Sequence, residues 1–251
     1  MKKLFFLSVI TIAILSACNK TDDFSPVSLG DYNLQTPGKY IIYQLDSISY
    51  ANNGIPQTIS YFAKDVVDSV PITDTLGRTG YRIYHYIKKN ESDEWQPDNT
   101  FFTIPTKSNI EFIADNLRYI KLAAPMTEGF SWKGNAYIDT KTQTQTVTTP
   151  GVADWDLSYM DDWDYMYSNV NQPATVGNLS FDSTVTVNER DEVSGDTTDV
   201  SYYSEVTHSV EQYAKGVGLV YRNFVHRIWQ PGLGAYESTS YGITLTIIDH
   251  N

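Results

Sequence analysis

The strongest constraint on this fold is a succession of strand-like runs that are separated by turn residues. The runs KYIIYQLDSISY (Lys39–Tyr50) and QTISYFAKDVV (Gln57–Val67) flank Asn53-Gly54, a pair that accepts positive φ and is typical of a tight hairpin. Of the 251 residues 41% are hydrophobic, which favours a packed core over disorder, and the 19 tyrosines favour strands over a helical bundle. The sequence therefore predicts an all-β protein.

Further runs continue this pattern to the end of the chain. In the last of them Tyr241, Ile243, Leu245 and Ile247 alternate with smaller or polar residues, so we expect these four side chains to point inward. A flat open sheet of so many strands would expose its edges. We therefore expect one domain, residues 39–251, as an antiparallel meander closed or curled into a barrel (lipocalin-like or half-barrel), with at most one or two short helices. The further runs are Gly80–Lys89, Ser183–Arg190, Val200–Ala214, Gly216–Trp229 and Ser240–Asp249.

One acidic, aromatic segment, Val152–Val170, breaks the strand pattern. Its large side chains recur at helical spacing, which predicts a helix, but aspartate, tyrosine and tryptophan are weak helix formers, so an irregular or partly extended segment is the alternative. Its aromatic rings are of a kind that stacks on sugars, and its aspartates are able to bind hydroxyls or calcium. The competing interpretation, favoured by the absence of a loop glycine or a ladder of ligands, is that the rings plug a barrel mouth or cover a sheet face. The candidate ligand-binding residues are Trp155, Trp163, Tyr165 and Tyr167.

The N-terminus has the three regions of an export signal. Lys2 and Lys3 are followed by an apolar stretch, Leu4–Leu15, that is too short to span a bilayer. The residues LSAC that end at Cys18 resemble the lipobox of bacterial lipoproteins. The resemblance implies that residues 1–17 are a cleaved signal peptide and that Cys18, the only cysteine, receives diacylglycerol and acyl chains such as palmitate. The alternative for Cys18 is a buried free thiol.

Residues 18–38 are expected to be the lipidated cysteine and a flexible tether, because they are polar and rich in turn residues. Lys20, Asp22 and Asp23 resemble the export signal that some Gram-negative bacteria place after the lipidated cysteine, and Asn19 lacks the aspartate that retains lipoproteins at the inner membrane. An ordinary acidic linker is the alternative. We expect an outer-membrane lipoprotein on the cell surface rather than the periplasmic face. Its partners are then the membrane, through the lipid, and the lipoprotein export machinery.

No motif for catalysis stands out in the sequence. There is no Gly-x-Ser-x-Gly motif and no phosphate-binding glycine loop, and His85, His208, His226 and His250 lack zinc-site spacing. Adjacent acids such as Asp161 and Asp162 are ordinary on a protein surface. A formal net charge of −12 opposes nucleic-acid binding. We therefore expect no enzyme, no cofactor and no metal.

The second half of the chain, above all YAKGVGLVYRNF (Tyr213–Phe224) and YGITLTIIDHN (Tyr241–Asn251), resembles a group of uncharacterised bacterial lipoproteins. More loosely, the chain is similar to lipocalin-like and half-barrel lipoproteins, which implies hydrophobic cargo but carries no site residues across. The expected function is a non-catalytic binding module for a glycan, a lipid or a protein. The alternatives are a structural or envelope-assembly lipoprotein and, third, a hydrolase. An apolar cavity would favour lipid, exposed aromatic rings would favour glycan, and converging carboxylates would favour the hydrolase.

Overall fold

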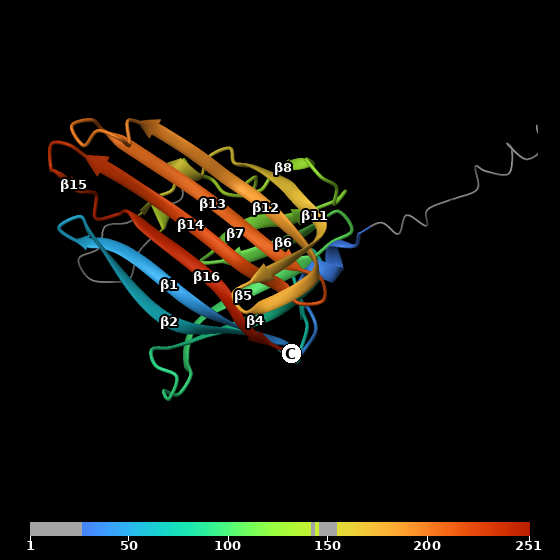
Figure 1. The fold of residues 1–251 in the computed structure, drawn as a ribbon. Helices are drawn as coiled ribbons and strands as arrows, with labels where there is room; N and C mark the ends of the chain where they lie inside the picture. Colours follow the sequence, from blue (N-terminus) through green and yellow to red (C-terminus); the bar gives the residue numbers. More distant parts are fainter. Residues whose placement is uncertain (1–26, 142–143, 146–154) are drawn as a thin grey trace, which may run out of the picture.

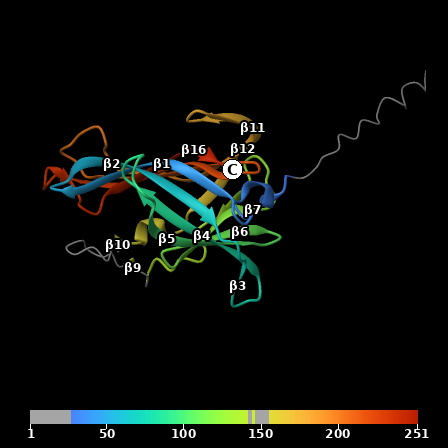
Figure 2. The same ribbon diagram turned by 90° about the horizontal axis from the view of Figure 1, so that it is seen from below.

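The computed structural model describes residues 27–141, 144–145 and 155–251, and it confirms the all-β prediction. Twelve antiparallel strands follow one another in a sheet that curls into a nearly closed barrel (Figures 1 and 2). The described residues contain two short 3-10 helices and no helix that is long and apolar enough to cross a membrane. The helices are η1 (Leu29–Tyr32) and η2 (Ser158–Met160). The strands are β1 (Tyr40–Asn52), β2 (Ile55–Val67), β3 (Ile72–Thr73), β4 (Thr79–Lys88), β5 (Gln96–Pro105), β6 (Asn109–Ala114), β7 (Leu117–Ala123), β8 (Ser131–Lys133), β9 (Thr144–Gln145), β10 (Trp155–Asp156), β11 (Asp164–Val176), β12 (Leu179–Gly195), β13 (Ser204–Ala214), β14 (Gly218–Gln230), β15 (Ala235–Tyr236) and β16 (Tyr241–His250).

The order of the strands is β7-β6-β5-β4-β2-β1-β16-β14-β13-β12-β11-β8. Most neighbours are joined by a hairpin, as a meander requires. The last long strand, β16, lies between β1 and β14, so the end of the domain pairs with its beginning. Four short strands lie off this path: β15 pairs with β14 and β3 with β4, while β9 and β10 form a separate two-stranded sheet.

Hydrogen bonds also bridge the seam between the two edge strands, β7 and β8. The Ile120 amide donates to the carbonyl of Gly134 at 2.8 Å, and the Trp132 indole donates to the carbonyl of Ile120 at 2.8 Å. The hydroxyl of Tyr167 in β11 donates to the carbonyl of Ala123 at 2.8 Å and accepts from its amide at 2.7 Å. Backbone groups that an open edge would expose are therefore paired across the seam.

The predicted β1–β2 hairpin turns at Asn53 and Gly54, which have φ of 52° and 70°. Positive φ at both turn residues is what the Asn-Gly pair predicted. Gly54 is also required for space, because an added Cβ would lie 2.3 Å from the carbonyl oxygen of Tyr236. The turn therefore packs directly against the β15 segment.

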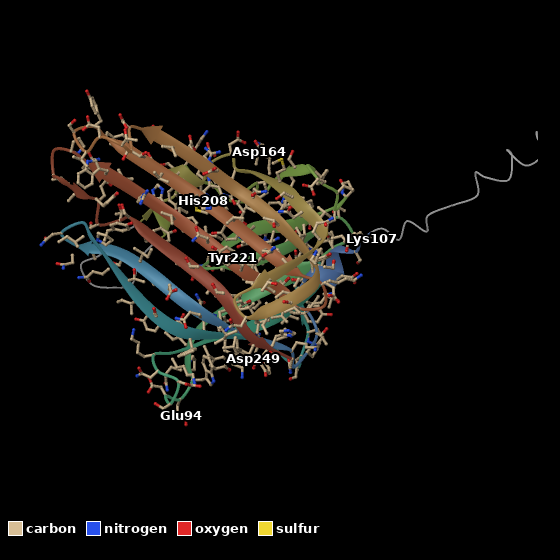
Figure 3. The ribbon with its side chains drawn as sticks, viewed as in Figure 1. Glu94, Lys107, Asp164, His208, Tyr221 and Asp249 are labelled. Atoms are coloured by element: carbon tan, nitrogen blue, oxygen red, sulfur yellow. The ribbon has the colours of Figure 1, made fainter. Side chains whose placement is uncertain are left out.

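The inner face of the sheet is only partly apolar. The four residues of β16 that were expected inside do line the core or the cavity described below. In β13, however, the buried residues include Thr207, Ser209 and Glu211, while His208 lies on the outer face of the sheet, opposite Val225 of β14 (Figure 3). Polar side chains therefore point into the barrel.

Three expectations about segment boundaries need correction. Residues 29–38 were expected in the tether. Leu29 and Tyr32 are instead buried in the core, and the Tyr32 hydroxyl lies 2.6 Å from that of Ser183. The helix η1 is therefore part of the domain and closes one end of the barrel. The strand expected from Val200 begins at Ser204, because Val200–Tyr203 form the exposed turn. The helix considered within residues 152–170 is absent from its described part, which holds β10, η2 and the start of β11.

Candidate functional site

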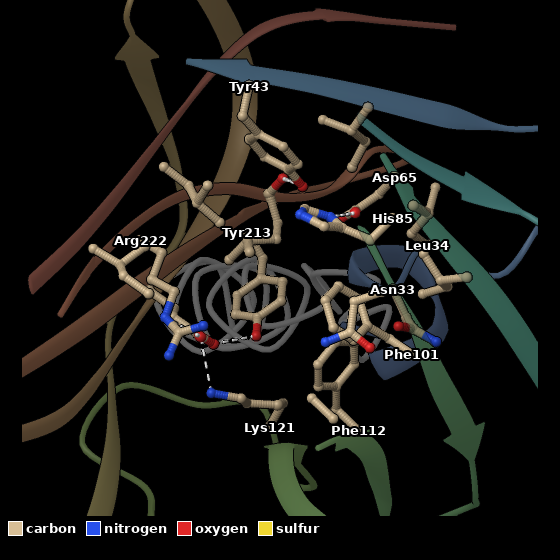
Figure 4. A pocket seen from close by; sticks show the side chains of 18 of the residues that line it. Asn33, Leu34, Tyr43, Asp65, His85, Phe101, Phe112, Lys121, Tyr213 and Arg222 are labelled. Atoms are coloured by element: carbon tan, nitrogen blue, oxygen red, sulfur yellow. Dashed lines mark hydrogen bonds and ion pairs between the residues drawn. The ribbon is translucent and has the colours of Figure 1, made fainter. Parts of the chain in front are cut away.

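The barrel encloses a cavity of about 300 Å³. Its walls come from β1, β2, β4, β5, β6, β7, β13, β14 and β16, and the chain beyond η1 contributes Asn33 and Leu34 (Figure 4). Strands hold these side chains at fixed positions, so the cavity is already formed without a ligand. Most of the wall is apolar and includes Ile41, Leu45, Phe101, Phe112, Leu122 and Ile243.

One side of the cavity carries a buried cluster of charges. The Lys121 ammonium of β7 donates to Glu189 of β12 and to Glu211 of β13, each at 2.8 Å. The other carboxylate oxygens accept from Ser209, at 2.6 Å to Glu189, and from Tyr213, at 2.5 Å to Glu211. Both glutamates are only 2% exposed, so these hydrogen bonds replace the water that the charges have lost.

The two glutamates differ in how readily they ionise. Burial and the charge of Glu211 raise the pKa of Glu189 above its ordinary value. Burial also disfavours the ionised form of Glu211, but the charges of Lys121 and Arg222 outweigh it and lower the pKa of Glu211. Glu211 is therefore the more firmly ionised member of the pair.

Arg222 of β14 lies directly opposite Glu211 in the register of β13 and β14. Its Nε is 3.6 Å from a Glu211 oxygen, which allows electrostatic attraction but is too long for a hydrogen bond. This buried Nε is without a hydrogen-bond partner in the described structure, and the guanidinium points toward the cavity (Figure 4). Arg222 is therefore a charged residue of the cavity wall whose N–H groups are able to donate hydrogen bonds to a ligand.

A second polar group surrounds His85 of β4. Its Nδ1 lies 2.6 Å from Asp65, and its Nε2 lies 3.7 Å from the exposed carboxylate of Asp98. Burial lowers the pKa of His85, but the hydrogen bond and charge of Asp65, with the charges of Asp98 and Asp115, outweigh burial and raise this pKa above its ordinary value. The imidazole is thus held in its charged form to higher pH than a free histidine.

The arrangement has some features of a catalytic site, but the groups are not available for one. Glu189 and Glu211 converge as glycosidase carboxylates do, yet the Lys121 ammonium lies between them and Glu189 does not line the cavity. The His85–Asp65 pair has no serine, threonine or cysteine beside it among the described residues of the wall. Within the described ranges, no three His, Cys, Asp or Glu side chains are grouped so as to hold a metal ion.

The structure places three of the candidate sugar-binding residues in the core. Trp163, Tyr165 and Tyr167 are 2% exposed or less. Their polar atoms bond to protein: the Trp163 indole to the carbonyl of Tyr159, the Tyr165 hydroxyl to Asn135, and the Tyr167 hydroxyl to Ala123. Protein covers their rings, so these residues form no exposed platform for a sugar and instead correspond to the competing interpretation, a structural role.

The side chains of the other predicted site residues lie outside the described part of the structure. The backbone of Trp155 is in β10, but its side chain is outside the described part. The expected lipidation residue Cys18 and the expected export signal, Lys20, Asp22 and Asp23, are also outside the described residues. Lipidation and export therefore stay predictions from the sequence.

Sequence reasoning missed the charged cluster at the cavity: Lys121, Glu211 and Arg222 of the wall, and Glu189 behind them. A signal was present, because Lys121 stands within the apolar run YIKLA and Glu211 precedes QYA at the end of a strand. A charge inside an apolar strand run indicates either an outer face or a paired interior charge. Only the strand register distinguishes these two interpretations, because it places Arg222 opposite Glu211.

Comparisons with protein-family models, with curated proteins and with solved structures found no match to this chain.

Proposed function

We propose that this protein is a membrane-anchored, surface-exposed lipoprotein whose β domain is a non-catalytic binding module for a small apolar or amphipathic molecule. The observation that carries the proposal is the preformed cavity of about 300 Å³ inside the barrel. Its size lies at the lower end of the range for small-molecule sites, and its wall is mainly apolar, as such sites are. A lipid-like ligand fits this wall better than a glycan, because three of the residues expected to stack on sugars, Trp163, Tyr165 and Tyr167, are buried.

Two observations support binding rather than catalysis. The carboxylates of Glu189 and Glu211 already accept hydrogen bonds from Lys121, Ser209 and Tyr213. They are therefore not free to exchange protons with a substrate. The cavity wall, as far as the structure describes it, lacks a hydroxyl or thiol nucleophile of serine, threonine or cysteine beside His85. A glycosidase would need a pair of carboxylates free to act on the substrate, and a hydrolase with a covalent intermediate would need a nucleophile beside its base.

The anchor rests on the N-terminal sequence. Two or more acyl chains on Cys18 give durable membrane attachment, whereas one chain gives only marginal binding. Cys18→Ser should abolish incorporation of labelled palmitate. In a matched control that combines Cys18→Ser with Ser28→Cys, the thiol is moved away from the lipobox, and this variant should also stay unlabelled. Labelling of Cys18→Ser would contradict the proposed anchor.

The binding role is tested by blocking the cavity. Leu45 faces the cavity, so Leu45→Trp adds a large ring there, while Ile59→Trp on the exposed part of β2 is a matched control. The full chain is purified from the membrane of its host and extracted with organic solvent, and the extract is analysed by mass spectrometry. We expect about one small amphipathic molecule per chain from wild type and Ile59→Trp, and far less from Leu45→Trp. Extracts without such a molecule from wild type would favour the structural or envelope-assembly role instead.

A further inference from the structure

We propose that the ligand of this cavity is an apolar molecule with one carboxylate, and that the Arg222 guanidinium receives this carboxylate. The inference rests on the proposed function and goes further by naming the head group and the residue that selects it. It is carried by the geometry of Arg222 within the charged cluster.

Arg222 has unused donors that face the cavity. A guanidinium presents five N–H groups, yet no described residue accepts a hydrogen bond from Arg222, and its closest anionic partner is Glu211 at 3.6 Å from Nε. One third of the side chain, 33%, is accessible even though it belongs to the interior of the barrel, because it borders the cavity. A planar carboxylate matches the paired donors of a guanidinium, which makes it the favoured occupant.

The neighbouring polar groups are already paired. The Lys121 ammonium donates to two glutamates, and the Tyr213 hydroxyl donates to Glu211. The Tyr43 hydroxyl donates to the carbonyl of Leu219 at 3.0 Å, and the Asn33 amide pairs with Thr103. Among these groups only Arg222 would gain new hydrogen bonds from a ligand without losing old ones.

The charges of the cluster are balanced before a ligand binds, because Lys121 and Arg222 lie beside Glu189 and Glu211. Lys121 donates to both glutamates at 2.8 Å. Arg222 is the cation of the cluster whose donors stay open toward the cavity, so a ligand carboxylate would form a direct hydrogen-bonded ion pair there.

The size of the cavity bounds the rest of the ligand. A volume of about 300 Å³ equals the share of roughly ten water molecules, and therefore fits roughly ten non-hydrogen atoms. Apolar side chains such as Phe101 and Phe112 lie on the side away from Arg222 (Figure 4). Octanoate, a short chain with one carboxylate, is a probe of this size.

A cationic ligand is the main competitor, because Asp98 and Asp115 are on the exposed part of the wall. Asp115, however, accepts a hydrogen bond from Asn99 at 2.9 Å, and Asp98 is 45% exposed, so water reaches its carboxylate. The buried side-chain donor of this wall that has no hydrogen bond in the described structure is the Nε of Arg222, and this difference favours an anion.

The test is calorimetric titration of the full chain with octanoate, 1-octanol and octylamine. We expect octanoate to bind most tightly. Arg222→Met should weaken octanoate binding by roughly tenfold to a hundredfold, the value of a charged hydrogen bond, and leave octanol binding unchanged. Arg222→Lys, which keeps the charge but loses the paired donors, should give an intermediate loss.

Arg190→Met is the matched control, because Arg190 also has a buried Nε without a partner in the described structure but lies outside this cavity. It should bind octanoate like wild type, and thermal unfolding of every variant shows whether it is folded. Equal binding of octanoate and octanol, tighter binding of octylamine, or an unchanged affinity of folded Arg222→Met would overturn the head-group assignment alone. If none of the three probes binds to wild type, the proposed function itself fails.

Discussion

His85 is a residue of the cavity wall whose charge makes the stability of the fold depend on pH. Its raised pKa means that the folded state binds the proton more tightly than the unfolded state, where the pKa is near its ordinary value of about 6.5. The His85–Asp65 pair therefore contributes its full stability below about pH 6.5. That contribution is lost as the pH rises through the folded-state pKa.

We predict that His85→Gln lowers the free energy of unfolding more at pH 5 than at pH 9. Denaturant titration of both proteins at several pH values measures the difference. His208→Gln is the control, since His208 also lies near an aspartate, at 3.3 Å, but this pair is exposed and screened by water. A stability difference for His85→Gln that is constant with pH would show that the imidazole contributes only by packing.

At the scale of elements, local signals predicted the hairpins well. The β1–β2 turn and the inward face of β16 follow from residues that are close in sequence. Local patterns did not predict burial that depends on residues far away in the sequence. Tyr32 is buried at the end of the barrel, where its hydroxyl hydrogen-bonds with that of Ser183, and the hydroxyl of Tyr167 bonds to the backbone of Ala123. The interior charges were missed for the same reason, because alternation does not tell which face of a half-polar strand points inward.

The β1–β2 turn gives a matched pair of glycine substitutions. Gly54 and Gly38 both have positive φ, at 70° and 79°, but an added Cβ meets the carbonyl oxygen of Tyr236 only at Gly54. Gly38→Ala should cost about 1 kcal/mol, the strain of the backbone alone. Gly54→Ala should cost clearly more, as measured by thermal or denaturant unfolding. Equal losses would show that the turn does not pack against β15 in solution.

At the scale of the whole molecule, barrel closure and the cavity depend on each other. The sheet is curled because its first and last long strands pair, and the seam is bridged by Trp132 and Tyr167. Closure leaves an interior that side chains do not fill, and the polar cluster around Lys121 lies at this gap. The barrel class was predicted from the succession of hairpins, whereas the cavity was not, because its volume depends on how side chains from nine strands and the η1 segment pack together.

The most direct measurement is a crystal structure of the full chain grown with 8-bromooctanoate, with the bromine located by its anomalous signal. Our account predicts bromine inside the barrel near the apolar wall and the carboxylate within hydrogen-bonding distance of Arg222. Bromine only on the outer surface, with the cavity holding water or closed by its own side chains, would contradict the claim that this barrel is a binding module.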